Sequence, residues 1–111
     1  MKSAVYTVLI AGTVMAALGQ IAFKLGATGR ETLWAFLNGW ILVGLASYGI
    51  GTALWIFALS KASLTVVYPF TALTFVLVYF AGVLVLGEPT SAKQLFGVGF
   101  VLVGLYLITA V

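Results

Sequence analysis

The sequence predicts an all-α membrane protein in which four transmembrane helices are joined by short loops. Of its 111 residues, 64% are hydrophobic and 6% are charged, whereas soluble domains carry about 25% charged residues. The charged residues leave uncharged runs over 3–23, 32–60, 62–87 and 94–111, which are 21, 29, 26 and 18 residues long. A helix needs about 20 mostly apolar residues to cross the hydrocarbon core of a bilayer. Four such runs therefore predict four spans.

The first two helices are predicted over about 4–25 and 34–59. The segment 26–29 begins and ends with glycine, which can supply a left-handed cap at the end of the first helix. Trp34 and Trp40 stand at the start of the second helix. Because tryptophan favours the headgroup region of a membrane, we expect this start to lie at the interface.

The last two helices are predicted over about 65–86 and 92–110. Pro69 falls in an early turn of the third helix, where a missing backbone N–H matters least. Ser91 and Gln94 form a candidate capping box at the start of the fourth helix, in which each side chain bonds a free N–H of the first turn.

Short loops make consecutive helices antiparallel, and they make residues 1–111 a single domain. The basic residues divide between the two membrane sides as Lys2 and Lys61 against Lys24, Arg30 and Lys93. A difference of one basic residue gives little preference for either orientation. If Lys24 is a functional residue and is not counted as an anchor, the two membrane sides carry equal numbers of basic residues. The protein could then insert in both orientations and form an antiparallel homodimer.

Composition excludes several classes of function. The chain has no cysteine and no histidine, so disulfides, thiol catalysis and the usual transition-metal sites are excluded. The basic residues stand near the span ends, where topology explains them without a nucleic-acid partner. The two carboxylates lie in different loops and no serine has a nucleophile motif, so we expect neither an enzyme nor a cofactor. The first apolar run exceeds the about 7 to 15 residues of a signal peptide, and we expect a retained helix.

A polar stripe follows one face of the first predicted helix. Thr13, Ala17, Gln20 and Lys24 succeed one another at spacings of 4, 3 and 4, which places them on one side of a helix. Lys24 is either an anchor whose ammonium reaches the interface or a ligand for an anionic headgroup. Gln20 favours the ligand role, because an anchor needs no neutral hydrogen-bonding neighbour, although Gln20 could also bond an adjacent helix.

Two further faces complement this stripe. Gly44, Ser47 and Gly51 form a small-residue pattern that lets helix backbones approach closely. Tyr68 and Tyr79 lie on one face of the third helix, where tyrosine also serves packing or interfacial roles. We expect the faces to meet around one cleft, and Arg30 otherwise anchors the first loop. The substrate-binding candidates are Thr13, Gln20, Lys24, Arg30, Tyr68 and Tyr79.

The C-terminal half resembles the EamA-like repeat of the drug/metabolite transporter superfamily. The residues that carry this resemblance are Val67-Tyr68-Pro69, Leu86-Gly87-Glu88-Pro89-Thr90-Ser91, Gln94-Leu95-Phe96-Gly97 and Gly104. The segment 18–24, with Gly-Gln followed by Lys, is similar to the short four-span subunits that flip aminoarabinose-linked undecaprenyl phosphate. The two resemblances cover nearly the whole chain and imply a drug/metabolite transporter type bundle.

Length, helix count and the pair Gly97 and Gly104 also resemble the small multidrug resistance family. In that family such a pair in the fourth helix packs the dimer, so the resemblance implies dimer packing at these two glycines. Those exporters carry a glutamate in their first helix that alternately holds protons and a cationic drug. Placing their glycine and lysine positions on Gly19 and Lys24 puts Ala16 where that glutamate stands.

The charge pattern favours an anionic ligand, because a cation would meet no countercharge inside the spans while a phosphate would meet Lys24. The resemblance supplies the glycolipid. We therefore expect a flippase subunit for a polyprenyl-phosphate-linked sugar or similar anionic lipid, acting in a bacterial-type inner (plasma) membrane. Its expected partners are membrane lipids and either a second copy or a similar subunit. The alternatives are a small multidrug resistance type cation exporter without the glutamate and a non-transporting assembly protein.

Overall fold

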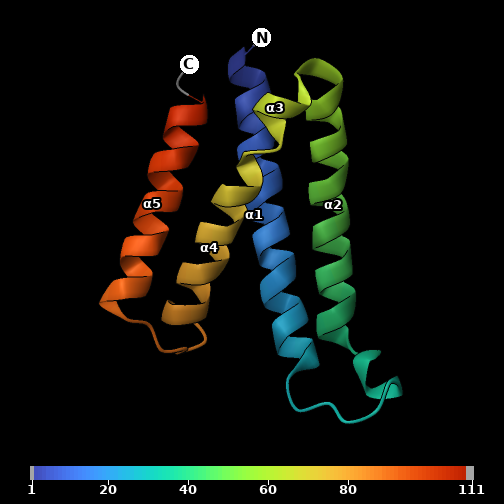
Figure 1. The fold of residues 1–111 in the computed structure, drawn as a ribbon. Helices are drawn as coiled ribbons and strands as arrows, with labels where there is room; N and C mark the ends of the chain where they lie inside the picture. The colour runs from blue at the N-terminus through green and yellow to red at the C-terminus, as the bar shows by residue number, and fades with distance from the viewer. Residues whose placement is uncertain (1, 110–111) are drawn as a thin grey trace.

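The computed structural model describes residues 2–109 and contains only helices within that range (Figure 1). Their bounds are α1 Lys2–Ala27, the 3-10 helix η1 Trp34–Phe36, α2 Gly39–Lys61, α3 Leu64–Val67, α4 Phe70–Leu84 and α5 Ala92–Thr109. α3 and α4 follow one another as a single apolar stretch over Leu64–Leu84, so four segments are long and apolar enough to cross a membrane. This confirms the predicted four-span, all-α fold.

The four spans are consecutive in the sequence and alternate in direction (Figure 1). The N-terminus, the turn from α2 to α3 and the end of α5 lie at one end of the bundle. The 28–38 loop and the 85–91 loop lie at the other end. α1 contacts α2 and α4, whereas α5 packs mainly against α4. The helices that form the centre of the protein are therefore α1, α2 and α4.

Glycines bring the backbones of α1 and α2 into contact. A Cβ atom on Gly19 would lie 3.0 Å from the carbonyl oxygen of Gly44, and a Cβ on Gly51 would lie 3.0 Å from the carbonyl oxygen of Gly12. Between these two contacts, the buried hydroxyl of Ser47 donates a hydrogen bond of 2.7 Å to the carbonyl oxygen of Met15. The expected close approach of the small-residue face on α2 is therefore made to α1.

The start of the second helix at residue 34 was predicted wrongly. Residues 34–36 form the separate turn η1, and α2 begins after Asn38, whose backbone is extended at φ −136° and ψ 171°. The Asn38 side-chain oxygen accepts hydrogen bonds from the N–H groups of Trp40 and Ile41. Its amide nitrogen donates to the carbonyl oxygen of Gly26 at 3.0 Å. Asn38 thus caps α2 and ties it to the end of α1, a helix that extends to Ala27 rather than residue 25.

The predicted third helix over 65–86 is interrupted at Pro69, which has no N–H to donate. α3 ends at Val67, and α4 begins at Phe70 with short-range bonds from Thr71 to Tyr68 and from Ala72 to Pro69. α4 ends at Leu84, before the predicted residue 86. Gly87 then adopts φ +71°, a left-handed conformation that favours glycine. The turn lets the Glu88 N–H bond the carbonyl oxygen of Gly82 at 3.0 Å.

α5 begins with half of the predicted capping box. The Ser91 hydroxyl accepts from the Gln94 N–H at 3.2 Å. The Gln94 side chain does not return to the first turn of the helix, because its oxygen accepts a bond of 3.4 Å from the Tyr79 hydroxyl. Val98 is the only buried residue of α5 over its described length. The predicted final residue of this helix, 110, lies outside the described residues.

Replacement of Gly51 by leucine should destabilise the protein, because the new side chain would press against the α1 backbone. Its Cβ would lie 3.2 Å from the Ala16 nitrogen, and overpacking of this kind costs about 1 to 3 kcal/mol. We expect a lower melting temperature for Gly51→Leu in detergent, measured by circular dichroism.

Gly49→Leu is the matched control, because no atom lies within 4 Å of a Cβ at Gly49. This variant should melt at or above the temperature of the wild type. Equal melting temperatures for the two variants would contradict a direct contact between the α1 and α2 backbones.

Candidate functional site

A polar cleft opens between α1, α2 and the α3–α4 segment. Residues of α1, residues of α2 and residues on both sides of Pro69 form its three sides. Its volume is about 420 Å³. Its lining residues are Gly12, Thr13, Ala16, Gln20, Tyr48, Gly51, Thr52, Trp55, Tyr68, Thr71 and Thr74. We refer to this site as the cleft.

The threonine hydroxyls of the cleft are bonded to the backbones of their own helices. Thr13 donates to the carbonyl oxygen of Ile10 at 2.7 Å, Thr52 to that of Tyr48 at 2.9 Å, and Thr71 to that of Tyr68 at 2.9 Å. A hydroxyl that donates in this way still has an acceptor site free. These residues therefore make the cleft polar without leaving an unpaired donor inside the membrane.

Four polar side chains of the cleft have no such partner. The Gln20 amide, the hydroxyls of Tyr48 and Tyr68 and the indole N–H of Trp55 make no hydrogen bond to any residue within 2–109. An amide both donates and accepts, as does a phenolic hydroxyl. The cleft therefore presents neutral hydrogen-bonding groups from all three of its sides to a ligand.

Lys24 continues the α1 face that leads into the cleft. Thr13 and Ala17 are 1% and 5% exposed where α4 covers α1, whereas Gln20 and Lys24, on the same face, are exposed. The cause is that α4 diverges from α1 towards the 85–91 loop (Figure 1). Lys24 is not among the lining residues. It lies one helical turn beyond Gln20, about 6 Å further along the axis.

Tyr79 and Arg30 lie outside the cleft. The Tyr79 hydroxyl bonds Thr90 and Gln94 near the 85–91 loop, and its ring packs against Phe75 and Phe80. The Arg30 Nε donates to the carbonyl oxygen of Gly26 at 2.9 Å. Of the six predicted substrate-binding residues, the structure thus brings Thr13, Gln20 and Tyr68 together and places Lys24 next to them along α1.

Sequence reasoning missed the α2 wall of the cleft. Tyr48, Thr52 and Trp55 line it, and the Trp55 ring meets the Tyr68 ring edge-on with centroids 6.3 Å apart. The signal was present, because spacings of 4 and 3 place these residues on one helix face. The prediction considered only the small residues Gly44, Ser47 and Gly51 of the same helix, which pack on α1.

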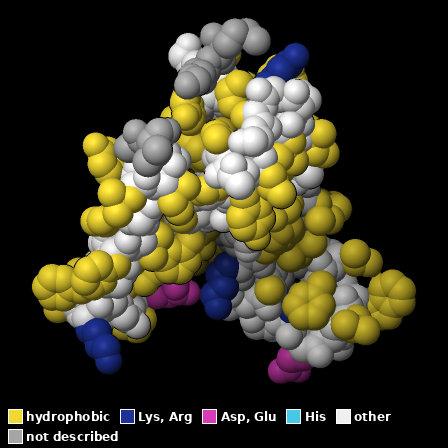
Figure 2. Space-filling model, turned by 45° about the horizontal axis from the view of Figure 1, so that its top comes forward, with side chains coloured by type: hydrophobic (Ala, Val, Ile, Leu, Met, Phe, Trp, Pro, Cys, Tyr) yellow, Lys and Arg dark blue, Asp and Glu magenta, His cyan; other side chains and the backbone are white. Residues whose placement is uncertain are grey.

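No acidic side chain lines the cleft, and residues 2–109 hold no cluster of histidine, cysteine, aspartate or glutamate that could bind a metal ion. Charged side chains are few on the mostly apolar surface (Figure 2). Ala16, the position expected to correspond to the small multidrug resistance glutamate, lines the cleft. The position is thus exposed to a ligand but supplies no countercharge to a cation.

The chain matches the EamA-like transporter family over residues 1–110 and belongs to that family. It is a multi-pass membrane protein of the drug/metabolite transporter type. This confirms the family resemblance of its sequence. No solved structure matches the chain.

The similar curated proteins include several that are named as probable flippase subunits. The chain is 31% identical over 106 residues to the probable 4-amino-4-deoxy-L-arabinose-phosphoundecaprenol flippase subunit ArnE of Pseudomonas savastanoi pv. phaseolicola, covering 91% of this chain and 93% of the relative. It is 31% identical over 108 residues to the protein of the same name from Yersinia pestis, covering 94% and 95%. The protein of that name from Enterobacter sp. is 27% identical over 105 residues, covering 93% and 94%.

A single cysteine at position 52 should report water access to the cleft, because the chain has no cysteine of its own. Thr52 lines the cleft, whereas the neighbouring Ala53 is exposed but lies outside it. Thiols react as thiolates, which form only where water reaches them. In membranes, we expect a charged maleimide to label Thr52→Cys at least tenfold faster than Ala53→Cys. Equal labelling rates would show that the cleft is not an aqueous site.

Proposed function

We propose that this protein is a flippase subunit that moves a polyprenyl-phosphate-linked sugar, or a similar anionic lipid, across the membrane. The observation that carries the proposal is a neutral polar cleft without any carboxylate, followed one helical turn later by the ammonium of Lys24. Family membership and the printed names of the ArnE relatives support the same class of substrate.

The cleft suits the sugar part of such a lipid. Its volume of about 420 Å³ falls near the low end of the about 300 to 1,000 Å³ common for small-molecule sites. The Gln20 amide and the hydroxyls of Tyr48 and Tyr68 can exchange hydrogen bonds with sugar hydroxyls. The ring of Trp55 can pack against the apolar face of a sugar. The polyprenyl chain is too long for this volume, so it stays in the surrounding bilayer.

Lys24 suits the phosphate. A charge-assisted hydrogen bond to phosphate is stronger than a neutral one, and a lysine within one turn of Gln20 lies within reach of a phosphate attached to a sugar in the cleft. Since no carboxylate lines the cleft, nothing there competes with the phosphate for the ammonium. Transport requires no covalent step, so the proposal gives the chain no catalytic role.

The proposed assembly is a dimer, formed with a second copy or with a similar subunit, in a bacterial-type inner (plasma) membrane. The printed word "subunit" in the names of the relatives supports a partner. The cleft is open to its surroundings, and a second subunit would enclose the path of the headgroup. α5 is the proposed contact, because within residues 2–109 no packing neighbour lies within 4 Å of a Cβ at Gly97 or Gly104.

Replacing Lys24 separates the ligand role from the anchor role. Lys24→Arg keeps the charge and should largely preserve the affinity for a short-chain polyprenyl phosphate. Lys24→Met removes the charge. Charge-assisted bonds contribute about 1.5 to 3 kcal/mol, so the methionine variant should bind on the order of tenfold or more weakly. Affinities can be measured by microscale thermophoresis in detergent.

Lys93→Met is the control for general loss of charge, because Lys93 lies at the same end of the bundle at the start of α5. It should bind like the wild type. If Lys24→Met also binds like the wild type while properly inserted, Lys24 is an anchor and the proposed phosphate site is wrong.

The dimer contact can be tested at the α5 glycines. Gly97 and Gly104 are seven residues apart and lie on nearly one face, while Gly99 points to the opposite side of the helix. Leucine at both 97 and 104 should separate two closely packed helices and lower the dimer fraction, measured by subunit-exchange fluorescence. Gly99→Leu should leave the dimer fraction unchanged. An unchanged dimer in the double variant would remove this face from the contact.

A further inference from the structure

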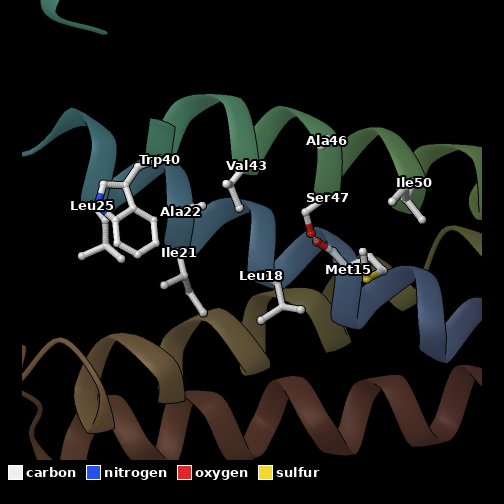
Figure 3. A pocket seen from close by; sticks show the side chains of 10 residues that line it. All are labelled: Met15, Leu18, Ile21, Ala22, Leu25, Trp40, Val43, Ala46, Ser47 and Ile50. Atoms are coloured by element: carbon white, nitrogen blue, oxygen red, sulfur yellow. Dashed lines mark hydrogen bonds between the residues drawn. The ribbon is translucent and has the colours of Figure 1, made fainter. Parts of the chain in front are cut away.

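A second recess follows α1 and α2 on the side away from the cleft. Its volume is about 510 Å³. In Figure 3, its side chains project from the two helices along a shared groove, with Leu25 and Trp40 at one end and Met15 and Ile50 at the other. Its one polar side chain is Ser47, whose hydroxyl is already bonded to the Met15 carbonyl oxygen. We refer to this recess as the apolar groove.

The apolar groove has the length of one membrane leaflet. Along α1 it extends from Met15 to Leu25, which at 1.5 Å per residue corresponds to about 15 Å. The hydrocarbon core of a bilayer is about 30 Å thick, so each leaflet contributes about half of that. The groove therefore begins near the interface at the 28–38 loop and ends near the middle of the membrane.

A basic recess adjoins the interfacial end of the groove. It has a volume of about 460 Å³ and is lined by Arg30, Asn38, Gly39, Trp40 and Val43. Trp40 and Val43 line the apolar groove as well, so the two recesses lie side by side. Tryptophan at this depth is typical of the membrane interface.

Arg30 is the only charged residue that lines the basic recess. Its Nε is bonded to the carbonyl oxygen of Gly26, while the terminal nitrogens make no hydrogen bond to the described part of the chain. The Asn38 side chain is occupied, because it bonds Gly26, Ala35, Trp40 and Ile41. The bond to Gly26 fixes the guanidinium, and its free edge matches the bidentate geometry of a phosphate.

We propose that the basic recess and the apolar groove together bind one anionic phospholipid, with its phosphate on Arg30 and one acyl chain along α1 and α2. The combination decides the ligand: a free phosphate would leave the groove unused, and a lipid without net negative charge would leave the charge of Arg30 unbalanced. The site is separate from the cleft. It therefore goes beyond the proposed function and does not depend on the role of Lys24.

The test uses the fluorescence of Trp40 in liposomes. The other two tryptophans are replaced, Trp34→Phe and Trp55→Phe, so that Trp40 alone reports. The probes are phosphatidylglycerol and phosphatidylcholine, each brominated near the headgroup end of its chains, mixed into unbrominated phosphatidylcholine. We expect half-maximal quenching at an about tenfold lower mole fraction of the anionic lipid, because the choline ammonium of phosphatidylcholine competes with Arg30 for the phosphate. Equal mole fractions for the two lipids would overturn the proposal.

Two pairs of variants assign the preference to the two recesses. Arg30→Gln should abolish it and Lys93→Gln, at the same end of the bundle, should keep it. Ala46→Phe fills the groove from α2 and should weaken quenching by the anionic lipid, whereas Ala53→Phe, outside the groove, should not. A preference that survives Arg30→Gln, or that Ala46→Phe leaves unchanged, would overturn the proposal.

Native mass spectrometry provides a readout that needs no tryptophan replacement. The otherwise unchanged chain should retain one phosphatidylglycerol at collision energies that strip phosphatidylcholine, and Arg30→Gln should lose this difference. The fluorescence experiment changes Trp55 in the cleft, but native mass spectrometry leaves the cleft unchanged, and neither experiment measures binding at the cleft or at Lys24. Their failure would therefore leave the flippase proposal standing, and failure of the Lys24 test would leave this lipid site standing.

Discussion

Helices α1 and α2 approach so closely that the carbonyl oxygens of Gly44 and Gly12 would lie 3.0 Å from side-chain carbons added at Gly19 and Gly51. In a bilayer, lipid tails are as apolar as the helices, so close packing and polar contacts must hold helices together. The two glycine contacts and the Ser47 hydrogen bond meet this requirement. Because both helices are fixed by their backbones, the side chains on either side of the contact are free to line the cleft and the apolar groove.

The cleft combines polarity with neutrality. The hydroxyls of its threonines bond nearby backbone carbonyls, so these hydroxyls leave no unpaired donor inside the membrane. Charge inside a bilayer is costly, and the chain keeps its basic side chains at the ends of its spans, with Lys24 next to the cleft. On the proposed function, this division places the phosphate near the interface and the uncharged sugar in the cleft.

α5 differs from the other spans, because only one of its described residues is buried. Its anchorage to α4 includes the hydrogen bonds of Tyr79 with Thr90 and Gln94. Because so little of the surface of α5 is buried against the other helices, most of that surface is available to lipid or to another subunit. The open sides of Gly97 and Gly104 belong to this surface, which is why the proposed dimer contact lies there.

The sequence by itself determined the four spans, because the length of an uncharged apolar run is set by the thickness of the bilayer and needs no tertiary information. It also placed Thr13, Gln20 and Lys24 on one face, since helical periodicity fixes that relation. Only the tertiary structure decided what these residues face. The Asn38 cap and the Pro69 break depend on bonds made or lost locally in three dimensions, and they shifted the helix bounds. Which side chains share a recess depends on how the helices pack: Tyr48 and Trp55 of α2 line the cleft, whereas Tyr79 and Arg30 do not.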